Sequence, residues 1–273
     1  MVGNRMSRVG HFVSAVGLLL VTHGGSTSAQ SALTGQLSLV WGDPFDGGPA
    51  LLVPYLASSD GAPTRVRFAP GAEPLYADLV QLQGQTVTAT GSAAAPLATA
   101  EPVFDAYNLD RASASASPLA AEAITGTQPW ATLRCRFNDV AVDRVINTAI
   151  LTGSTFPSID EYWRETSFNN ITLAGSVVTA WVTLPHPRSY YIGTSANLSA
   201  LAADCTAASD AQVNFTSFVG INMLFNDALD CCLWGGGMTL TLDGLTKTWR
   251  TTWIGLPEDN YDGLYAGLAH ETG

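Results

Sequence analysis

Charged side chains are scarce in this sequence, and cationic ones are the scarcer kind. Only 13% of the 273 residues are charged, with 12 Lys and Arg against 23 Asp and Glu, so the formal net charge is −11. A nucleic-acid-binding surface needs clustered cations to neutralise phosphates. We therefore expect no nucleic acid among the partners of this protein.

Long apolar segments are also missing. The longest run near the amino terminus, residues 12–21, is about half of the ~20 residues that a membrane helix needs, and no later segment is a better candidate. Arg5 and Arg8 precede this run, and small residues follow it up to Ala29. This pattern predicts a secretory signal peptide over residues 1–29, and hence an extracellular protein without a membrane span.

The chain has only four cysteines, Cys135, Cys205, Cys231 and Cys232, and no CxxC pair. Export would permit a disulfide, whereas the spacing argues against a tetrathiolate metal site. Ring strain disfavours a bond between the two adjacent cysteines. We expect Cys205 to bond to one of them, and Cys135 to be a buried thiol in an apolar strand.

Several motifs of common enzyme classes are absent. The sequence has no Gly-x-Ser-x-Gly nucleophile motif, no phosphate-binding loop and no recognisable Ser-His-Asp set. Histidine is rare as well: beyond the predicted leader only His186 and His270 occur. His186 lies between two prolines, and we expect it in a surface loop.

Residues 33–92 contain short alternating runs separated by turn residues, which is typical of strands. We expect a small all-β domain here, an OB-like barrel. Residues 93–128 are rich in alanine, serine and proline, and such a composition builds no core, so we expect a linker. The predicted strands of the barrel are residues 35–41, 50–55, 64–68 and 85–90.

From residue 129 the periodicity changes, and helices alternate with strands. We expect helices at 142–151, 159–165 and 196–209, and strands at 130–137, within 171–184 and at 218–225. Asp243-Gly244 joins two further strands, 238–242 and 247–254, as a hairpin. The interleaved order predicts that residues 129–273 form an α/β unit, so that the whole chain is of the α+β class.

The sequence closes on an amphipathic helix. Tyr261, Leu264, Tyr265 and Leu268 recur every three or four residues and give the helix one apolar face. The pair His270-Glu271 follows on this helix. In the motif HExxH two histidines four residues apart bind zinc, and the glutamate acts as base.

The stretch from Trp130 onward resembles the immune-inhibitor-A-like and gametolysin-like zinc metallopeptidases, which are zincins. The resemblance implies that residues 129–273 are the amino-terminal part of a zincin-like catalytic domain. It also implies that the hairpin strand 238–242, or its partner, is the sheet edge along which an extended substrate lies. The matching segments are residues 137–139, 158–168, 173–175, 178–181, 184–191 and 268–273.

By this resemblance His270 is a zinc ligand and Glu271 is the general base of a secreted endopeptidase that acts on proteins or peptides. Position 274, where the motif has its second histidine, lies beyond the sequence. We therefore expect an amino-terminal fragment that is inactive as it stands. The alternative is an exported binding protein without catalysis, and the sequence leaves the oligomeric state open.

Overall fold

The computed structural model describes residues 31–58, 63–95, 101–112, 124–143, 145–155, 158–255 and 261–272, with only the backbone at 261–263. The predicted signal peptide and parts of the predicted linker lie outside these ranges. The described chain mixes strands and helices, so the α+β prediction is confirmed. None of the described helices has the length and apolar character to cross a membrane.

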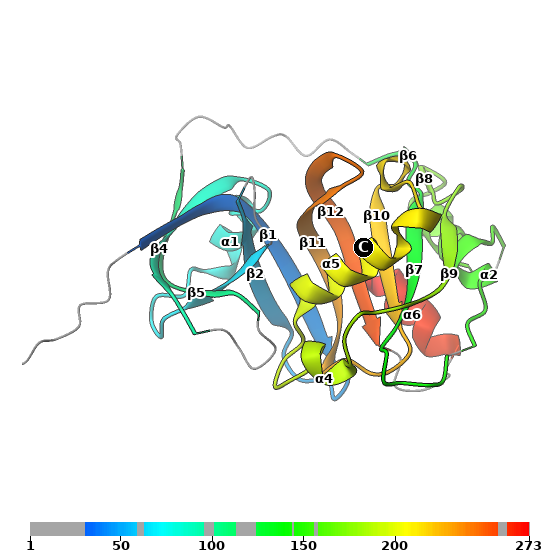
Figure 1. Cartoon of the computed structure of the whole chain (residues 1–273). Helices are drawn as coiled ribbons and strands as arrows, with labels where there is room; N and C mark the ends of the chain where they lie inside the picture. Colours follow the sequence, from blue (N-terminus) through cyan, green and yellow to red (C-terminus); the bar gives the residue numbers. More distant parts are fainter. Residues whose placement is uncertain are drawn as a thin grey trace, which may run out of the picture.

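The amino-terminal part is a closed barrel of five strands, which confirms the predicted barrel and adds one strand to the four that were predicted. The strands follow the order β1-β2-β3-β5-β4, and β4 pairs again with β1 to close the barrel. Helix α1 connects β3 to β4 (Figure 1). The elements are β1 Ser31–Pro44, β2 Leu51–Ala57, β3 Thr64–Phe68, α1 Tyr76–Leu82, β4 Thr86–Ala93 and β5 Val103–Arg111.

Alternation of side chains explains why these segments form a barrel. On β1, Leu37 and Leu39 point inward and are fully buried, and on β4 Val87 and Ala89 do the same. Side chains on successive strand residues face opposite sides, so every second residue fills the interior. Together with Phe104 of β5 they form one apolar core.

Strand β5 corrects the predicted linker. It lies inside residues 93–128, yet Val103, Phe104 and Ala106 are buried and the strand pairs with both β3 and β4. The alanine- and serine-rich flanks dominate the composition of residues 93–128, so a prediction from composition misses the strand between them. The barrel therefore extends to Arg111.

The carboxy-terminal part adds a five-stranded sheet of order β11-β12-β10-β7-β9. Strands β12, β10, β7 and β9 are mutually parallel, and β11 is antiparallel to β12. Its elements are β6 Gly126–Thr127, β7 Trp130–Arg136, α2 Ala149–Thr152, α3 Ile159–Thr166, β8 Ile171–Thr172, β9 Val177–Thr183, α4 Arg188–Tyr191, α5 Leu198–Ser209, η1 Asp210–Gln212, η2 Phe215–Ser217, β10 Gly220–Phe225, β11 Cys232–Leu242, β12 Leu245–Gly255 and α6 Tyr261–Glu271.

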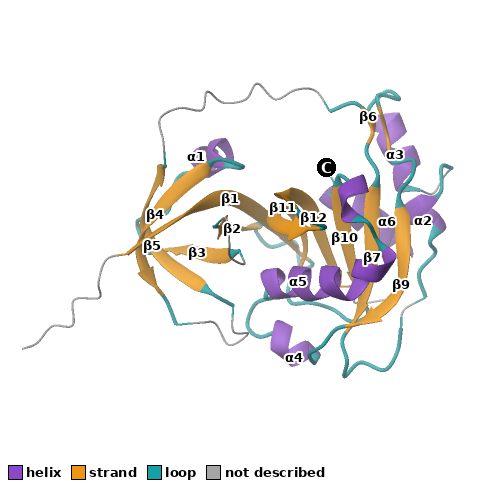
Figure 2. Cartoon of the chain, turned by 45° about the horizontal axis from the view of Figure 1, so that its top comes forward, coloured by secondary structure: helices purple, strands orange, loops and turns teal. Residues whose placement is uncertain are grey.

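Helices cover this sheet on both faces. Helix α5 packs on one face against Trp249 and Trp253, whereas α2, α3 and α6 pack on the other against Leu224 and Ile254. Figures 1 and 2 show α5 and α6 on opposite sides of β10 and β12. All six residues of β10 are buried, as expected for a central parallel strand with two covered faces.

Local signals fixed several of these elements correctly. Ser158 caps α3, its Oγ accepting a hydrogen bond from the backbone N–H of Glu161 at 3.1 Å. Asp243 and Gly244 form the β11–β12 turn with positive φ. The helix expected at 142–151 was wrong in extent, because among the described residues of this segment only Ala149–Thr152 form an α-helix.

A single strand joins the two parts. The 14 residues of β1 pair with β4 and β2 in the barrel, and then Val40 to Pro44 pair antiparallel with Gly236 to Cys232 on β11. One continuous ten-stranded sheet results. Figure 2 shows β1 running from the barrel to the edge of the second sheet.

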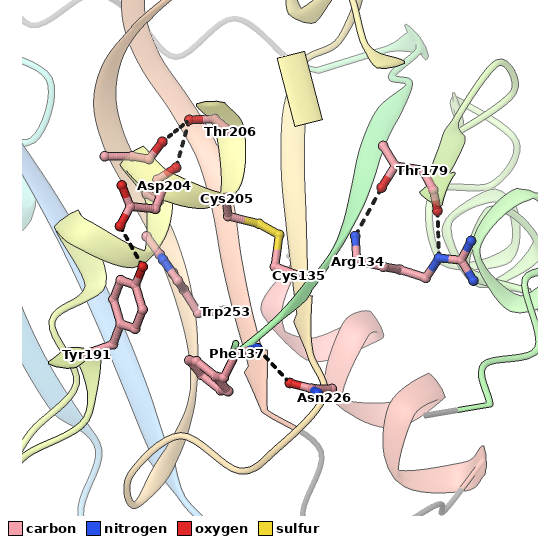
Figure 3. Close-up of a disulfide and its surroundings, with 12 residues drawn as sticks. Arg134, Cys135, Phe137, Thr179, Tyr191, Asp204, Cys205, Thr206, Asn226 and Trp253 are labelled. Atoms are coloured by element: carbon pink, nitrogen blue, oxygen red, sulfur yellow. Dashed lines mark hydrogen bonds between the residues drawn. A yellow bond between two sulfur atoms is a disulfide. The ribbon is translucent and has the colours of Figure 1, made fainter. Parts of the chain in front are cut away.

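The cysteine pairing differs from the expectation. Cys135 on β7 bonds to Cys205 on α5 (Figure 3), and Cys231 bonds to its neighbour Cys232. The predicted bridge from Cys205 to this adjacent pair and the predicted free thiol at Cys135 are both wrong. Helix α5 lies across the sheet with Cys205 directed toward β7, which brings the two buried sulfurs together.

Candidate functional site

The last turn of α6 carries the two residues singled out by the sequence. Leu264 and Leu268 are buried beneath the helix in the same core cluster as Ile254, as the helical spacing predicted. Just past the helix, the Oγ1 of Thr272 accepts a hydrogen bond from Trp163 Nε1 at 3.0 Å. This contact ties the end of α6 to α3 and fixes where the preceding residues lie.

His270 contacts a carboxylate from the opposite end of the chain. Its Nε2 lies 2.8 Å from Oδ2 of Asp43 on β1. The side chains of His270 and Asp43 are 66% and 42% exposed. The pair therefore lies at the mouth of a pocket, where ligands can reach it.

Glu271 is more enclosed than its neighbour. Its Oε1 is buried and has no hydrogen-bond partner in the described part of the chain. A Cβ atom at Gly235 of β11 would lie 2.2 Å from Oε2, so only glycine leaves room for this carboxylate. Burial raises the pKa of Glu271 to about 7, with His270 lowering it and Asp43 raising it.

These three side chains form a group with metal-ligating chemistry. One ligand atom each from Asp43, His270 and Glu271 lies within 4.8 Å of the others. Imidazole nitrogen and carboxylate oxygen are ligands that zinc accepts, and an unpartnered buried carboxylate oxygen is compatible with a cation beside it. The residues therefore fit a zinc ion. Asp43 was missed because no local pattern signals a contact between residues 227 positions apart.

A pocket of about 620 Å³ opens beside this group. Its floor is the glycine run 235–237 of β11 with Thr248 and Arg250 of β12, and the end of α6 forms one rim. Trp41 of β1 and Trp130 of β7 also line it. Aromatic surface and polar groups thus converge in one concave site, which is typical of ligand pockets.

The part of β11 beside this pocket is not a free edge, whereas the predicted substrate edge, residues 238–242, lies beyond the residues that pair with β1. Strand β11 pairs with β12 along one side, and β1 occupies the other side opposite residues 232–236. Backbone groups of this segment therefore already have partners, and an extended peptide cannot add there while β1 is in place. Gly236, with φ of 147°, allows β1 to approach, because a Cβ would lie 2.3 Å from the carbonyl oxygen of Leu39.

His186 has no part in the site. Its ring stacks on Tyr190 with centroids 3.9 Å apart. Among the described residues it belongs to no group of metal-ligating side chains. The structure therefore agrees with the expectation of a loop position and brings only His270 and Glu271 of the predicted residues together.

No protein-family model and no curated protein matches this sequence. The zincin resemblance therefore depends on the quoted residues, and the activity that it implies is argued below from the site.

Proposed function

We propose that this protein is a secreted zinc-dependent endopeptidase in which His270 binds the metal and Glu271 acts as general base. One observation carries the proposal. The two motif residues end a well-packed helix at an open pocket, and Asp43, a second potential ligand beside His270, lies 2.8 Å from it. Residues 129–273 would then be the amino-terminal part of a zincin-like catalytic domain.

Each side chain of the site has a separate role in the proposed reaction. Zinc bound at this site would polarise a peptide carbonyl and lower the pKa of a water molecule. His270 offers an exposed imidazole to hold the ion. Glu271 has an oxygen free to accept a proton, and Trp41 and Trp130 provide apolar walls for a substrate side chain.

The motif needs a second histidine four residues after His270. We propose that the helix continues with a histidine at position 274 in the complete protein. The described residues supply fewer protein ligands than a catalytic zinc site uses once Glu271 is reserved as the base. We therefore expect no peptidase activity from residues 1–273 alone.

The test compares this chain with a form extended along its own reading frame. Zinc content by elemental analysis and casein hydrolysis are measured for both, and for extended variants His270→Ala and Glu271→Ala. We expect only the extended form to be active. Glu271→Ala should keep zinc and lose about 10²-fold to 10⁴-fold in rate, whereas His270→Ala should lose zinc as well.

Glu165→Ala is the matched control, because it removes a carboxylate from α3 outside the pocket and should leave both readouts unchanged. Chelator-insensitive proteolysis by the short chain, or full activity of extended Glu271→Ala, would overturn the mechanism. A stop codon directly after Gly273, with peptide binding but no bound zinc, would support the alternative of an exported binding protein.

A further inference from the structure

Arg250 is a cation without a side-chain partner in the described part of the chain. It is partly buried on β12, and no hydrogen bond or ion pair is formed by its guanidinium within the described residues. Burial alone lowers its pKa. All other partly buried cations in the described ranges interact with an acceptor or an acid: Arg65, Arg134, Arg136, Arg164, Arg188 and Lys247.

The sheet gives Arg250 an open position on the face that carries α6. Its neighbour Trp249 is fully buried in the core under α5, so the alternation of strand side chains directs Arg250 to the opposite face. The residues paired with it on both flanking strands are glycines, Gly237 on β11 and Gly220 on β10. Neither neighbour has a side chain that can bind or cover the guanidinium.

Arg250 lies where two pockets meet. It lines the larger pocket that holds Glu271, and also a smaller one of about 250 Å³ with apolar walls that include Leu173 and Trp163. Trp130 borders both pockets. An acidic group entering here would find a cation at the junction and apolar surface for its aliphatic stem.

We propose that Arg250 binds a carboxylate of the peptide substrate and so sets a preference for acidic peptides. A guanidinium binds a carboxylate through two parallel hydrogen bonds, which gives direction as well as strength. The proposal rests on the proposed function for the nature of the ligand as a peptide. The carboxylate-binding step itself needs neither zinc nor hydrolysis.

Two sources of carboxylate are chemically equivalent here, an Asp or Glu side chain and a free peptide carboxy terminus. The test uses the full chain treated with chelator and short alanine peptides with a central Glu or Gln. Each peptide is acetylated, and is prepared with an amidated or a free carboxy terminus. Binding is followed by calorimetry and by tryptophan fluorescence, since Trp41 and Trp130 line the pocket.

We expect the amidated Glu peptide to bind about ten-fold or more tightly than its Gln counterpart. Arg250→Gln should abolish the difference, and Arg250→Lys should retain only part of it, because an ammonium lacks the planar fork. Arg67→Gln is the control, since Arg67 pairs with Asp105 in the barrel and should leave the preference intact. Thermal unfolding of each variant verifies that it is folded.

A preference for the free carboxy terminus over the amide, lost in Arg250→Gln, would support the proposal and identify the terminal carboxylate as the ligand. Equal binding of all peptides by the wild-type chain, or a preference that survives in folded Arg250→Gln, would refute it. Because the protein is free of metal, neither result depends on whether the zinc peptidase proposal holds.

Discussion

The barrel region and the end of α6 each enclose a glutamate, and the two glutamates differ in their hydrogen-bond partners. In the barrel region Glu101 is fully buried, and its two oxygens accept hydrogen bonds from Tyr55 at 2.7 Å and Arg65 at 3.1 Å. At the end of α6, Glu271 is partly buried, and its Oε1 has no hydrogen-bond partner among the residues that the structure describes. Burial raises the pKa of both groups. Both oxygens of Glu101 thus have partners from the protein itself, whereas Oε1 of Glu271 is available to a ligand.

Removing Arg65, the cation that pairs with Glu101, should cause the largest loss of stability. Arg65→Met would leave the Glu101 carboxylate without its charged partner in a buried site, and such a loss costs about 3 kcal/mol or more. Urea unfolding should show this decrease. Arg67→Met breaks an exposed pair with Asp105 and should cost less than ~1 kcal/mol; equal effects of the two changes would mean that burial does not distinguish the pairs.

The stability of the protein should depend on pH through the ionisation of Glu101. Burial is the main cause that raises the folded-state pKa of Glu101 above 4.5, so the unfolded chain ionises first as pH rises. Stability from this group is therefore fully present below pH 4.5 and falls as pH increases through the folded-state pKa. Glu101→Gln should lack this component. Parallel stability profiles of wild type and variant between pH 4 and 7 would contradict the prediction.

The smallest change in stability is expected at the candidate metal site beside His270. Asp43→Asn removes an exposed partner of His270 and should alter the free energy of unfolding by less than ~1 kcal/mol. Zinc affinity of the extended protein should nevertheless fall about ten-fold, because Asp43 is one of the groups that could bind the ion and an amide is not among the ligands that zinc normally takes. Asp46→Asn, three residues along in the adjoining turn, is the control for both measurements, by urea unfolding and zinc titration.

Local chemistry made part of this structure predictable. The start of the helix at Ile159, the Asp243-Gly244 turn and the mostly apolar strand β10 each depend on a few neighbouring residues, and each was predicted correctly. The placement of His270 and Glu271 on a buried helix followed from its apolar spacing in the same way.

Contacts between distant segments were not predictable. Strand β5 was mistaken for linker because its flanks are rich in alanine, serine and proline, which masks one short strand between them. The Cys135–Cys205 bond depends on how α5 crosses the sheet, and the approach of Asp43 to His270 depends on the register of β1 against β11. Neither geometry is encoded within a short window of sequence.

The register of β1 also has a consequence for synthesis of the chain. Val40 pairs with Gly236, so the ribosome must add nearly 200 residues before the outer edge of this strand finds its partner. At ~5–20 residues per second that interval is about 10 to 40 s. Until β11 emerges, the nascent barrel presents unpaired backbone groups at the end of β1, and an exposed strand edge readily pairs with other chains. The end of β1 is thus open to such pairing during translation, although the five strands of the barrel are complete long before.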